Sequence, residues 1–135
     1  MASHTFEIRG SWYNDKTFPS LNDYIAQIGR NPKGANKFKS KYKTIAISSI
    51  RKHLRGLNIT KPVIIHYEFA EPSKGQKRDY MNIFSCADKF IEDALQDAKI
   101  LKGDDPRYVK NTTHEFYYTD GEPYIRVTLE EVDNV

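Results

Sequence analysis

NIFSCADKFIEDALQDAKI, residues 82–100, has the clearest periodic pattern in this chain and decides its predicted fold. Its apolar residues recur at helical spacing and cluster within a narrow arc at 100° per residue. The arc consists of Ile83, Ala87, Phe90, Ile91, Ala94, Leu95 and Ala98. The opposite side carries Asn82, Lys89 and Asp93. The segment is therefore predicted to be an amphipathic helix with one face on a hydrophobic core.

The segments around this helix supply the remaining predicted elements. Strand-like patterns occupy residues 5–9, 62–69, 113–119 and 124–129, and Asp120-Gly121-Glu122 between the last two is a hairpin turn signal. Helical spacing runs over residues 35–57, and a shorter helix is expected from a Ser20 cap to about Gly29. Residues 31–34 (NPKG) are predicted to form a turn. The order β-α-α-β-α-β-β predicts an α/β (α+β) fold, a mixed sheet of about four strands with helices on one side.

Composition limits the class of protein. The 135 residues correspond to a single domain, 1–135, and 39% hydrophobic with 29% charged residues is ordinary for a soluble globular protein. No apolar run approaches the roughly 18 residues of a membrane span, and MASHTFEIRG lacks the pattern of a signal peptide, so a cytoplasmic location is the default expectation. Cys86 is the only cysteine, which excludes an intrachain disulfide or a cysteine zinc site.

Charge is distributed unevenly along the chain. The net charge is +3, but residues 24–67 contain no Asp or Glu. The basic residues in this stretch are Arg30, Lys33, Lys37, Lys39, Lys41, Lys43, Arg51, Lys52, Arg55 and Lys61. The C-terminal part is acidic instead. This asymmetry favours a polyanion-binding face, and nucleic acid is preferred over a merely solvated lysine-rich helix.

Carboxylates flank the helix at 82–100. KRDYMN, residues 77–82, precedes it with Asp79, and GDD, residues 103–105, follows it with Asp104 and Asp105. Each has an ordinary alternative, because Asp suits a helix N-cap and Gly-Asp-Asp-Pro suits a turn. Together, beside Lys77 and Arg78, they predict a Mg²⁺ or Mn²⁺ site that acts on a phosphate backbone, provided that the chain folds back over the helix.

Lys89 is the predicted partner of these carboxylates. It lies on the polar helix face with Asn82, where an ammonium group can stabilise charge on a phosphate. The alternative is a solvated lysine or an i,i+4 pair with Asp93. The four histidines are scattered, and the chain has no glycine-rich phosphate loop.

In these motifs the chain resembles the RusA family of phage and prophage Holliday junction resolvases, in its Gram-positive-like branch. The resemblance covers nearly the whole chain, through PSLNDYI (19–25), KPVIIHYEF (61–69), KRDYMN (77–82), DKFIEDAL (88–95), ILKGDD (100–105) and IRVTLEEV (125–132). The motif that carries it is an Arg-Asp-x-Asp-Asn box, then a helix with Lys and Asp-Ala-Leu, then a loop Asp.

Matched residue by residue, Asp79 and Asn82 correspond to the box, Lys89 to the helical lysine and Asp104 to the loop carboxylate. The resemblance implies a RusA-like fold and a homodimer that binds four-way DNA junctions and nicks opposing strands with Mg²⁺. Phosphate contacts are expected from Lys37, Lys39, Lys41, Arg51, Lys52, Lys77 and Arg78, with Asn82 beside them.

Position 81 departs from the family pattern, because Met81 stands where the second carboxylate belongs. A thioether is a poor ligand for a hard cation. Asp105 is the best substitute, since Asp88 points away from Lys89 on the helical wheel. Three interpretations stay open: a weakened nuclease, a nuclease with rearranged ligands, and a protein that binds branched DNA or a protein partner without cutting. A basic globular protein unrelated to DNA is the remaining alternative.

Overall fold

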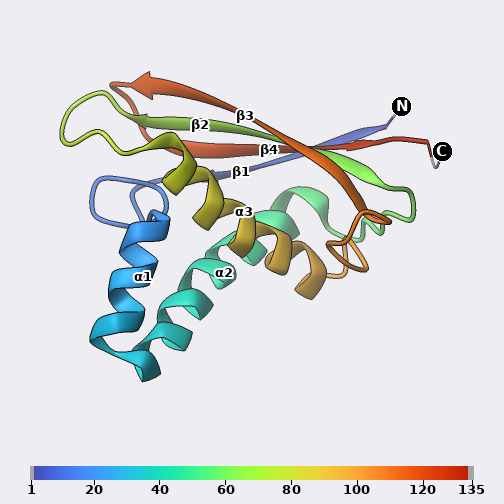
Figure 1. Cartoon of the computed structure of the whole chain (residues 1–135). Helices are drawn as coiled ribbons and strands as arrows, with labels where there is room; N and C mark the ends of the chain where they lie inside the picture. The colour runs from blue at the N-terminus through green and yellow to red at the C-terminus, as the bar shows by residue number, and fades with distance from the viewer. Residues whose placement is uncertain (1, 134–135) are drawn as a thin grey trace.

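A mixed sheet covered on one face by helices makes up this protein (Figure 1). The computed structural model describes residues 2–133. Its strands are β1 (Ser3–Arg9), β2 (Val63–Pro72), β3 (Val109–Thr119) and β4 (Tyr124–Glu131). Its helices are α1 (Leu21–Arg30), α2 (Pro32–Leu54) and α3 (Tyr80–Asp97), none of them both long and apolar enough to cross a membrane. The predicted order of elements and the α+β fold class are confirmed.

The sheet has the strand order β1-β4-β2-β3. β4 is antiparallel to both β1 and β2, whereas β3 is parallel to β2 and lies at the edge. The predicted hairpin between the last two strands is therefore wrong. β4 buries Ile125, Val127 and Leu129 completely enough to suit a central position, while β3 is at best half-buried along its whole length. The turn after β3 consequently carries the chain past the end of β2 rather than back along β3.

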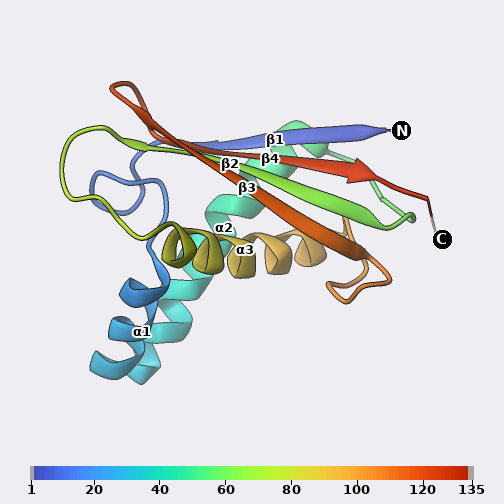
Figure 2. The same cartoon turned by 45° about the horizontal axis from the view of Figure 1, so that its top comes forward.

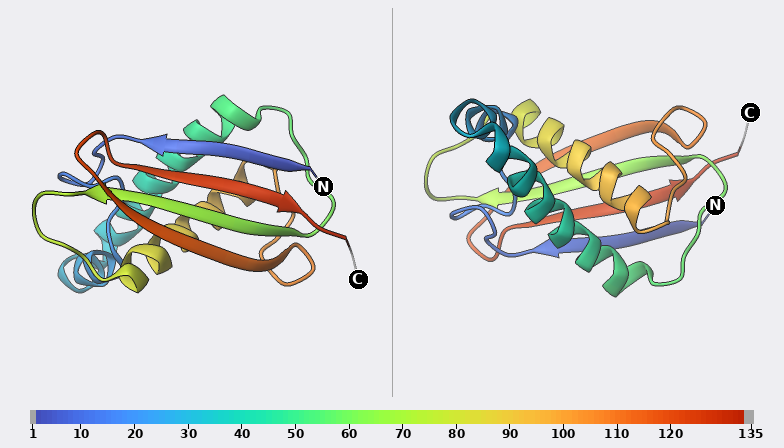
Figure 3. Two further views of the ribbon diagram at one scale, coloured as in Figure 1. Left: turned by 90° about the horizontal axis from the view of Figure 1, so that it is seen from above. Right: turned by 90° about the horizontal axis from the view of Figure 1, so that it is seen from below.

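The core fills the space between the sheet and the helices. Figure 3 shows α2 and α3 crossing below the sheet, while the upper face carries no helix. Strand residues alternate accordingly: Phe6, Val127 and Tyr67 are register neighbours that face the helices. Glu7, Arg126 and Glu68 are the next neighbours along these strands and form ion pairs across the open face. The alternation of apolar and polar residues in the strands therefore places one set on the buried, helix-covered face of the sheet and the other on the solvent-exposed face.

The helix boundaries follow their capping residues. Ser20 and Asp23 form the reciprocal capping box of α1, as the predicted Ser20 cap requires. Residues 31–34, predicted as a turn, instead begin α2: Asn31 accepts a hydrogen bond from the Gly34 N–H at 3.0 Å, and Pro32 occupies the first turn. Proline is favoured there because its missing N–H would have no intrahelical partner anyway. α2 ends at Leu54, just before Gly56 with φ of 79°.

A buried ion pair joins three parts of the chain near the start of α3. Figure 2 shows the loop after β2 beside the loop that follows β1. The Arg78 guanidinium donates to both Glu71 carboxylate oxygens, at 3.0 and 2.9 Å, and to the Phe18 carbonyl oxygen at 2.8 Å. Asp23 lies 3.8 Å away. The side chains of Arg78 and Glu71 are only 11% and 10% exposed. This pair ties the end of β2 to the loop before α1, so Arg78 is not free to contact DNA phosphates as the sequence had suggested.

We expect Arg78→Met to lower the free energy of unfolding by about 3–5 kcal/mol, because it leaves the Glu71 carboxylate buried without its partner. Urea unfolding followed by circular dichroism measures this loss. Lys77→Met is the matched control, because Lys77 is exposed and makes no ion pair within residues 2–133. Equal stability of the two variants would contradict the structural role given to Arg78.

Candidate functional site

Asp79 is the N-cap of α3. Its Oδ1 accepts a hydrogen bond from the Met81 N–H at 2.9 Å, and its carbonyl accepts the Ile83 N–H at 3.1 Å. The ordinary role considered for this residue is thus present in the structure. The second carboxylate oxygen has no hydrogen-bond partner in residues 2–133, and Asp79 is exposed. Tyr80 and Met81, in the same turn, are 55% and 44% exposed.

The carboxylate of Asp105 already forms an ion pair with Arg107 in the same loop. Arg107 donates to Oδ1 at 2.9 Å and to Oδ2 at 2.8 Å through its guanidinium, and its backbone N–H also donates to Oδ1. These contacts with Arg107 lower the pKa of Asp105 to about 2. Asp105 must break this bidentate pair before it can bind a metal, so it does not simply substitute for the carboxylate missing at position 81.

Asp79 and Asp104 lie at opposite ends of α3 within one chain. The helix has 18 residues, which corresponds to a length of about 27 Å. β2 delivers the chain to one end of α3, and the loop before β3 leaves from the other (Figure 1). Lys89 lies between them, ten residues after Asp79, or about 15 Å along the axis. The structure therefore does not bring together the three residues of the predicted site.

Within residues 2–133, no group of three metal-ligating side chains is close enough to hold an ion. Asp79 alone offers one free carboxylate oxygen, and its neighbour Met81 offers a soft thioether. A Mg²⁺ ion at Asp79 of one chain would therefore have a single carboxylate ligand, and waters and a substrate phosphate would have to complete its coordination.

The structure instead places Asp104 near two acids that sequence reasoning did not use. Asp88 accepts a hydrogen bond from the hydroxyl of fully buried Tyr67 at 2.7 Å. Glu92 follows one turn later, and its pKa is raised to about 9 by burial, then by its hydrogen bond with Asp88 and the charges of Asp88 and Asp104. Burial and the neighbouring negative charges favour the protonated form of Glu92, which can donate a hydrogen bond to Asp88. The i,i+4 spacing of the two acids was the available signal.

The lysines of α2 fall into two sets on different sides of the helix. Lys39 pairs with Asp93 at 3.0 Å, and Lys43 pairs with Asp97 at 2.8 Å, so both join α2 to α3. Asp93 therefore pairs across the helices with Lys39, and not with Lys89, whose i,i+4 pair with Asp93 was an alternative to a catalytic role. Lys37 and Lys41 are exposed and have no carboxylate partner in the described part of the chain. Of these four lysines, only Lys37 and Lys41 have charge available for an external anion.

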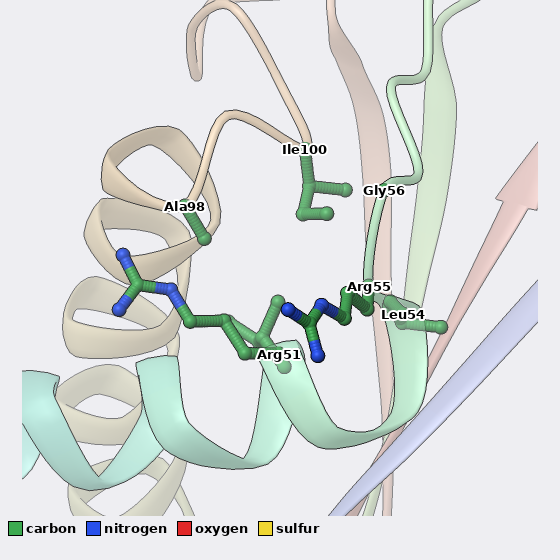
Figure 4. Close-up of a pocket in the computed structure, with 7 residues that line it drawn as sticks. Arg51, Leu54, Arg55, Gly56, Ala98 and Ile100 are labelled. Atoms are coloured by element: carbon green, nitrogen blue, oxygen red, sulfur yellow. The ribbon is translucent and has the colours of Figure 1, made fainter.

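A cavity of about 420 Å³ opens at the C-terminal end of α2 (Figure 4). Its lining combines Arg51 and Arg55 with the apolar side chains of Leu54, Ala98 and Ile100. Both arginines and the neighbouring Lys52 are exposed, and none of the three forms an ion pair within residues 2–133. This end of α2 therefore presents positive charge to solvent, although Arg55 was not among the residues assigned to DNA.

Glu92 gives the folded protein a distinctive pH dependence. The pKa of Glu92 is raised from its ordinary value to about 9 in the folded chain. Between these two pH values the folded chain therefore holds a proton that the unfolded chain has lost. The free energy of unfolding should therefore fall as pH rises from about 6 to about 9. After allowance for solvent screening, each pKa unit of difference between the folded and unfolded chains changes the free energy of unfolding by about 1.4 kcal/mol.

Glu92→Gln should flatten this dependence, because the amide retains the hydrogen bond to Asp88 without titrating. Urea unfolding at about pH 6 and about pH 9 compares the variants. Glu122→Gln, at an exposed carboxylate in the β3–β4 turn, is the control and should behave like the parent chain. A slope unchanged by Glu92→Gln would contradict the assignment.

Comparisons with known proteins add no family assignment: no protein-family model matches the sequence, and a search of curated proteins gives no significant match.

Proposed function

We propose that this protein is a structure-selective endodeoxyribonuclease that binds branched DNA as a homodimer. The observation that carries the proposal is the sorting of charge on α2. Interhelical pairs neutralise Lys39 and Lys43, whereas Lys37 and Lys41 remain free on another side of the helix. Free like charges at i and i+4 destabilise a helix, so an external polyanion is the natural partner of this side.

The structure changes the set of residues that we propose to contact DNA. Lys37, Lys41, Arg51 and Lys52 keep this role because all are exposed and unpaired within residues 2–133. Lys39 and Arg78 lose it because carboxylates already hold their charge. Phosphate contacts carry no base information, so these side chains support recognition of the shape of a branch more than of its sequence.

Lys77 has a smaller role in this scheme. Its ammonium group donates to the carbonyl oxygens of Pro72 and Ser73 and lies 4.6 Å from the centroid of the Tyr118 ring. A phosphate would have to compete with these contacts. Asn82, half-buried in the first turn of α3, remains near Asp79.

In this proposal the metal site for cutting is shared between two chains. Asp79 and Asp104 are separated by the length of α3 in one chain, so a metal held by both must lie between Asp79 of one subunit and Asp104 of the partner subunit. A twofold axis perpendicular to α3 brings these opposite ends together, because symmetry makes the two helices antiparallel. One or two carboxylates with waters and a substrate phosphate suffice for Mg²⁺.

The edge strand β3 offers a surface for such a dimer. It is 11 residues long and pairs only with β2. Tyr117 and Tyr118 on this strand are 49% and 61% exposed, and the Tyr80 ring lies 5.8 Å from that of Phe116. An unpaired edge with exposed aromatic side chains favours pairing with another chain. Antiparallel pairing of two β3 strands would also set the α3 helices antiparallel.

In the proposed reaction, Asp79 of one chain and Asp104 of the partner subunit would hold Mg²⁺, which would supply an activated water and charge stabilisation at the phosphodiester. The chain's own residues would orient the metal and the DNA strand and would screen the negative charge of the phosphates. Asp79, held by the Met81 N–H, keeps one oxygen turned to solvent, and exposed Lys89 supplies positive charge along the same helix. The lysines and arginines of α2 hold the neighbouring strand.

Met81 supports a second candidate function, a RusA-like protein that binds branched DNA or a protein partner without cutting. The side chain is 44% exposed at the position that the family pattern gives to a carboxylate. A thioether there weakens metal binding while leaving the DNA-binding residues on α2 unchanged.

Met81→Asp should increase nicking of a labelled synthetic four-way junction in Mg²⁺ or Mn²⁺ by ten-fold or more, because it adds an oxygen ligand beside Asp79. An acid in the first helical turn also suits the helix dipole, so folding should not suffer. Asp79→Asn in the same background should abolish nicking but not binding in EDTA. Junction binding without nicking by both the parent chain and Met81→Asp would exclude the nuclease and leave the second candidate.

Mixing two inactive variants tests whether sites are shared between chains. In the Met81→Asp background, Asp79→Asn and Asp104→Asn chains are each inactive alone. A mixed dimer regains one complete site, with Asp79 from one chain and Asp104 from the other, so mixing should restore single-strand nicking. Sites built within one chain would give no recovery. Each variant's dimer should be checked by analytical ultracentrifugation.

A further inference from the structure

Trp12 is a large apolar side chain held rigidly at the surface. Its indole is 47% exposed, although Nε1 donates a hydrogen bond to the Arg9 carbonyl oxygen at 2.8 Å. The ring also lies against Gly10, where a Cβ would come within 3.3 Å of Nε1, and Gly10 has φ of 115°. The Trp12 carbonyl accepts a hydrogen bond from the buried Tyr42 hydroxyl at 3.2 Å. The exposed ring is therefore anchored at several points rather than loosely placed.

The free lysines of α2 lie beside this ring. Trp12, Lys37, Ser40, Lys41, Thr44 and Ile45 line an open hollow of about 520 Å³. The hollow has no carboxylate in its lining, and neither of its two lysines has an ion-pair partner in residues 2–133. The ammonium of Lys41 has one internal contact, 5.1 Å from the centroid of the Tyr42 ring. An aromatic platform, two cations and two hydroxyl groups thus share one concave surface.

From this arrangement we infer that the hollow binds an unpaired nucleotide, with its base stacked on Trp12 and the adjacent phosphates on Lys37 and Lys41. Every base has a flat π-face, and a charged groove beside an exposed aromatic ring is how proteins hold single strands without reading sequence. A protein partner with an apolar surface would cover the indole but would leave both ammonium groups without anions. Charge complementarity therefore favours a polyanion with aromatic groups.

This inference rests on the proposed function and adds to it. Branched DNA has unpaired or unstacked bases at its branch point, and β1 and β2 run in the same direction because both are antiparallel to β4. The loop with Trp12 follows β1, and Asp79 follows β2, so both lie at the same end of the sheet (Figure 1). Trp12 would mark the branch point for the proposed catalytic end of the protein.

Trp12 is the only tryptophan, so tryptophan emission, excited at a wavelength that tyrosine does not absorb, reports on this hollow alone. The full chain should be titrated with an oligothymidylate and with an abasic strand that has the same number of phosphates. We expect the oligothymidylate to quench Trp12 emission and the abasic strand to bind without quenching. Binding of both strands, followed by anisotropy of a label on the DNA, with Trp12 emission unchanged would overturn the inference.

Substitutions separate base stacking from charge. Trp12→Ala should weaken oligothymidylate binding by roughly five- to hundred-fold and leave abasic binding unchanged, while Trp12→Phe should lose less. The double variant Lys37→Gln/Lys41→Gln should weaken binding of both strands. Its matched control removes the same charge from the same helix, as Lys39→Gln/Lys43→Gln, and should bind nearly as the parent does because those lysines are already paired. Equal losses for both strands in Trp12→Ala would contradict stacking.

The same titrations distinguish this inference from the proposed function. Quenching by oligothymidylate in a chain that neither prefers nor nicks four-way junctions would support the nucleotide site and reject the resolvase. Salt-dependent, junction-selective binding that is identical in the parent chain and Trp12→Ala would reject the site and leave the proposed function intact. Circular dichroism of each variant shows whether it retains the fold.

Discussion

The buried Arg78–Glu71 ion pair is the constraint on which the position of the candidate site depends. It fixes the end of β2 to the Phe18 carbonyl and lies beside Asp23 of the α1 capping box. Because Arg78 is pulled inward, the next residue, Asp79, begins α3 at the surface and caps it through the Met81 N–H. Arg78 and Asp79 are adjacent, charged and both candidates for DNA chemistry, yet the first is buried and the second is exposed. The ion pair stabilises the fold, and the Asp79 N-cap fixes the exposed first turn of α3.

α3 determines how the proposed chemistry must be organised. A helix of 18 residues cannot bring its two ends together, and the chain after it returns along β2 through the parallel strand β3 rather than over the helix. A nuclease on this scaffold that binds its metal through both Asp79 and Asp104 thus needs a second subunit, whereas a DNA-binding protein does not. In the proposed function, Met81 would weaken the metal site and leave α2 unaffected, so loss of cutting would leave DNA binding in place. This separation makes the two candidate functions states of one scaffold rather than unrelated activities.

Much of the fold could be predicted because its signals are local. The apolar arc of α3, the Ser20 cap and the alternation in the strands each depend on neighbouring residues. Strand order does not: β3 and β4 are adjacent in sequence, yet burial of Ile125, Val127 and Leu129 places β4 in the middle of the sheet. The site was less predictable for the same reason. Whether Lys39 is paired, Arg78 buried or Trp12 exposed depends on partners far away in the sequence, and no spacing rule encodes them.

Charge on the two faces of the molecule indicates the side from which DNA would approach. On the open face of the sheet, Arg126 donates to both Glu7 and Glu68, and His66 contacts Glu130 at 2.7 Å, so basic groups are outnumbered by the acids around them. A polyanion gains little there and would be repelled by the unneutralised carboxylates. The helical side differs, because α2 contains no acid and only part of its positive charge is used by α3. The strand polarity that places Trp12 and Asp79 at one end of the sheet, together with α2 below it, would therefore direct the proposed DNA ligand to the helical layer. The bare sheet face would then be left for solvent, and its acidic ion pairs would keep it apart from the phosphate backbone.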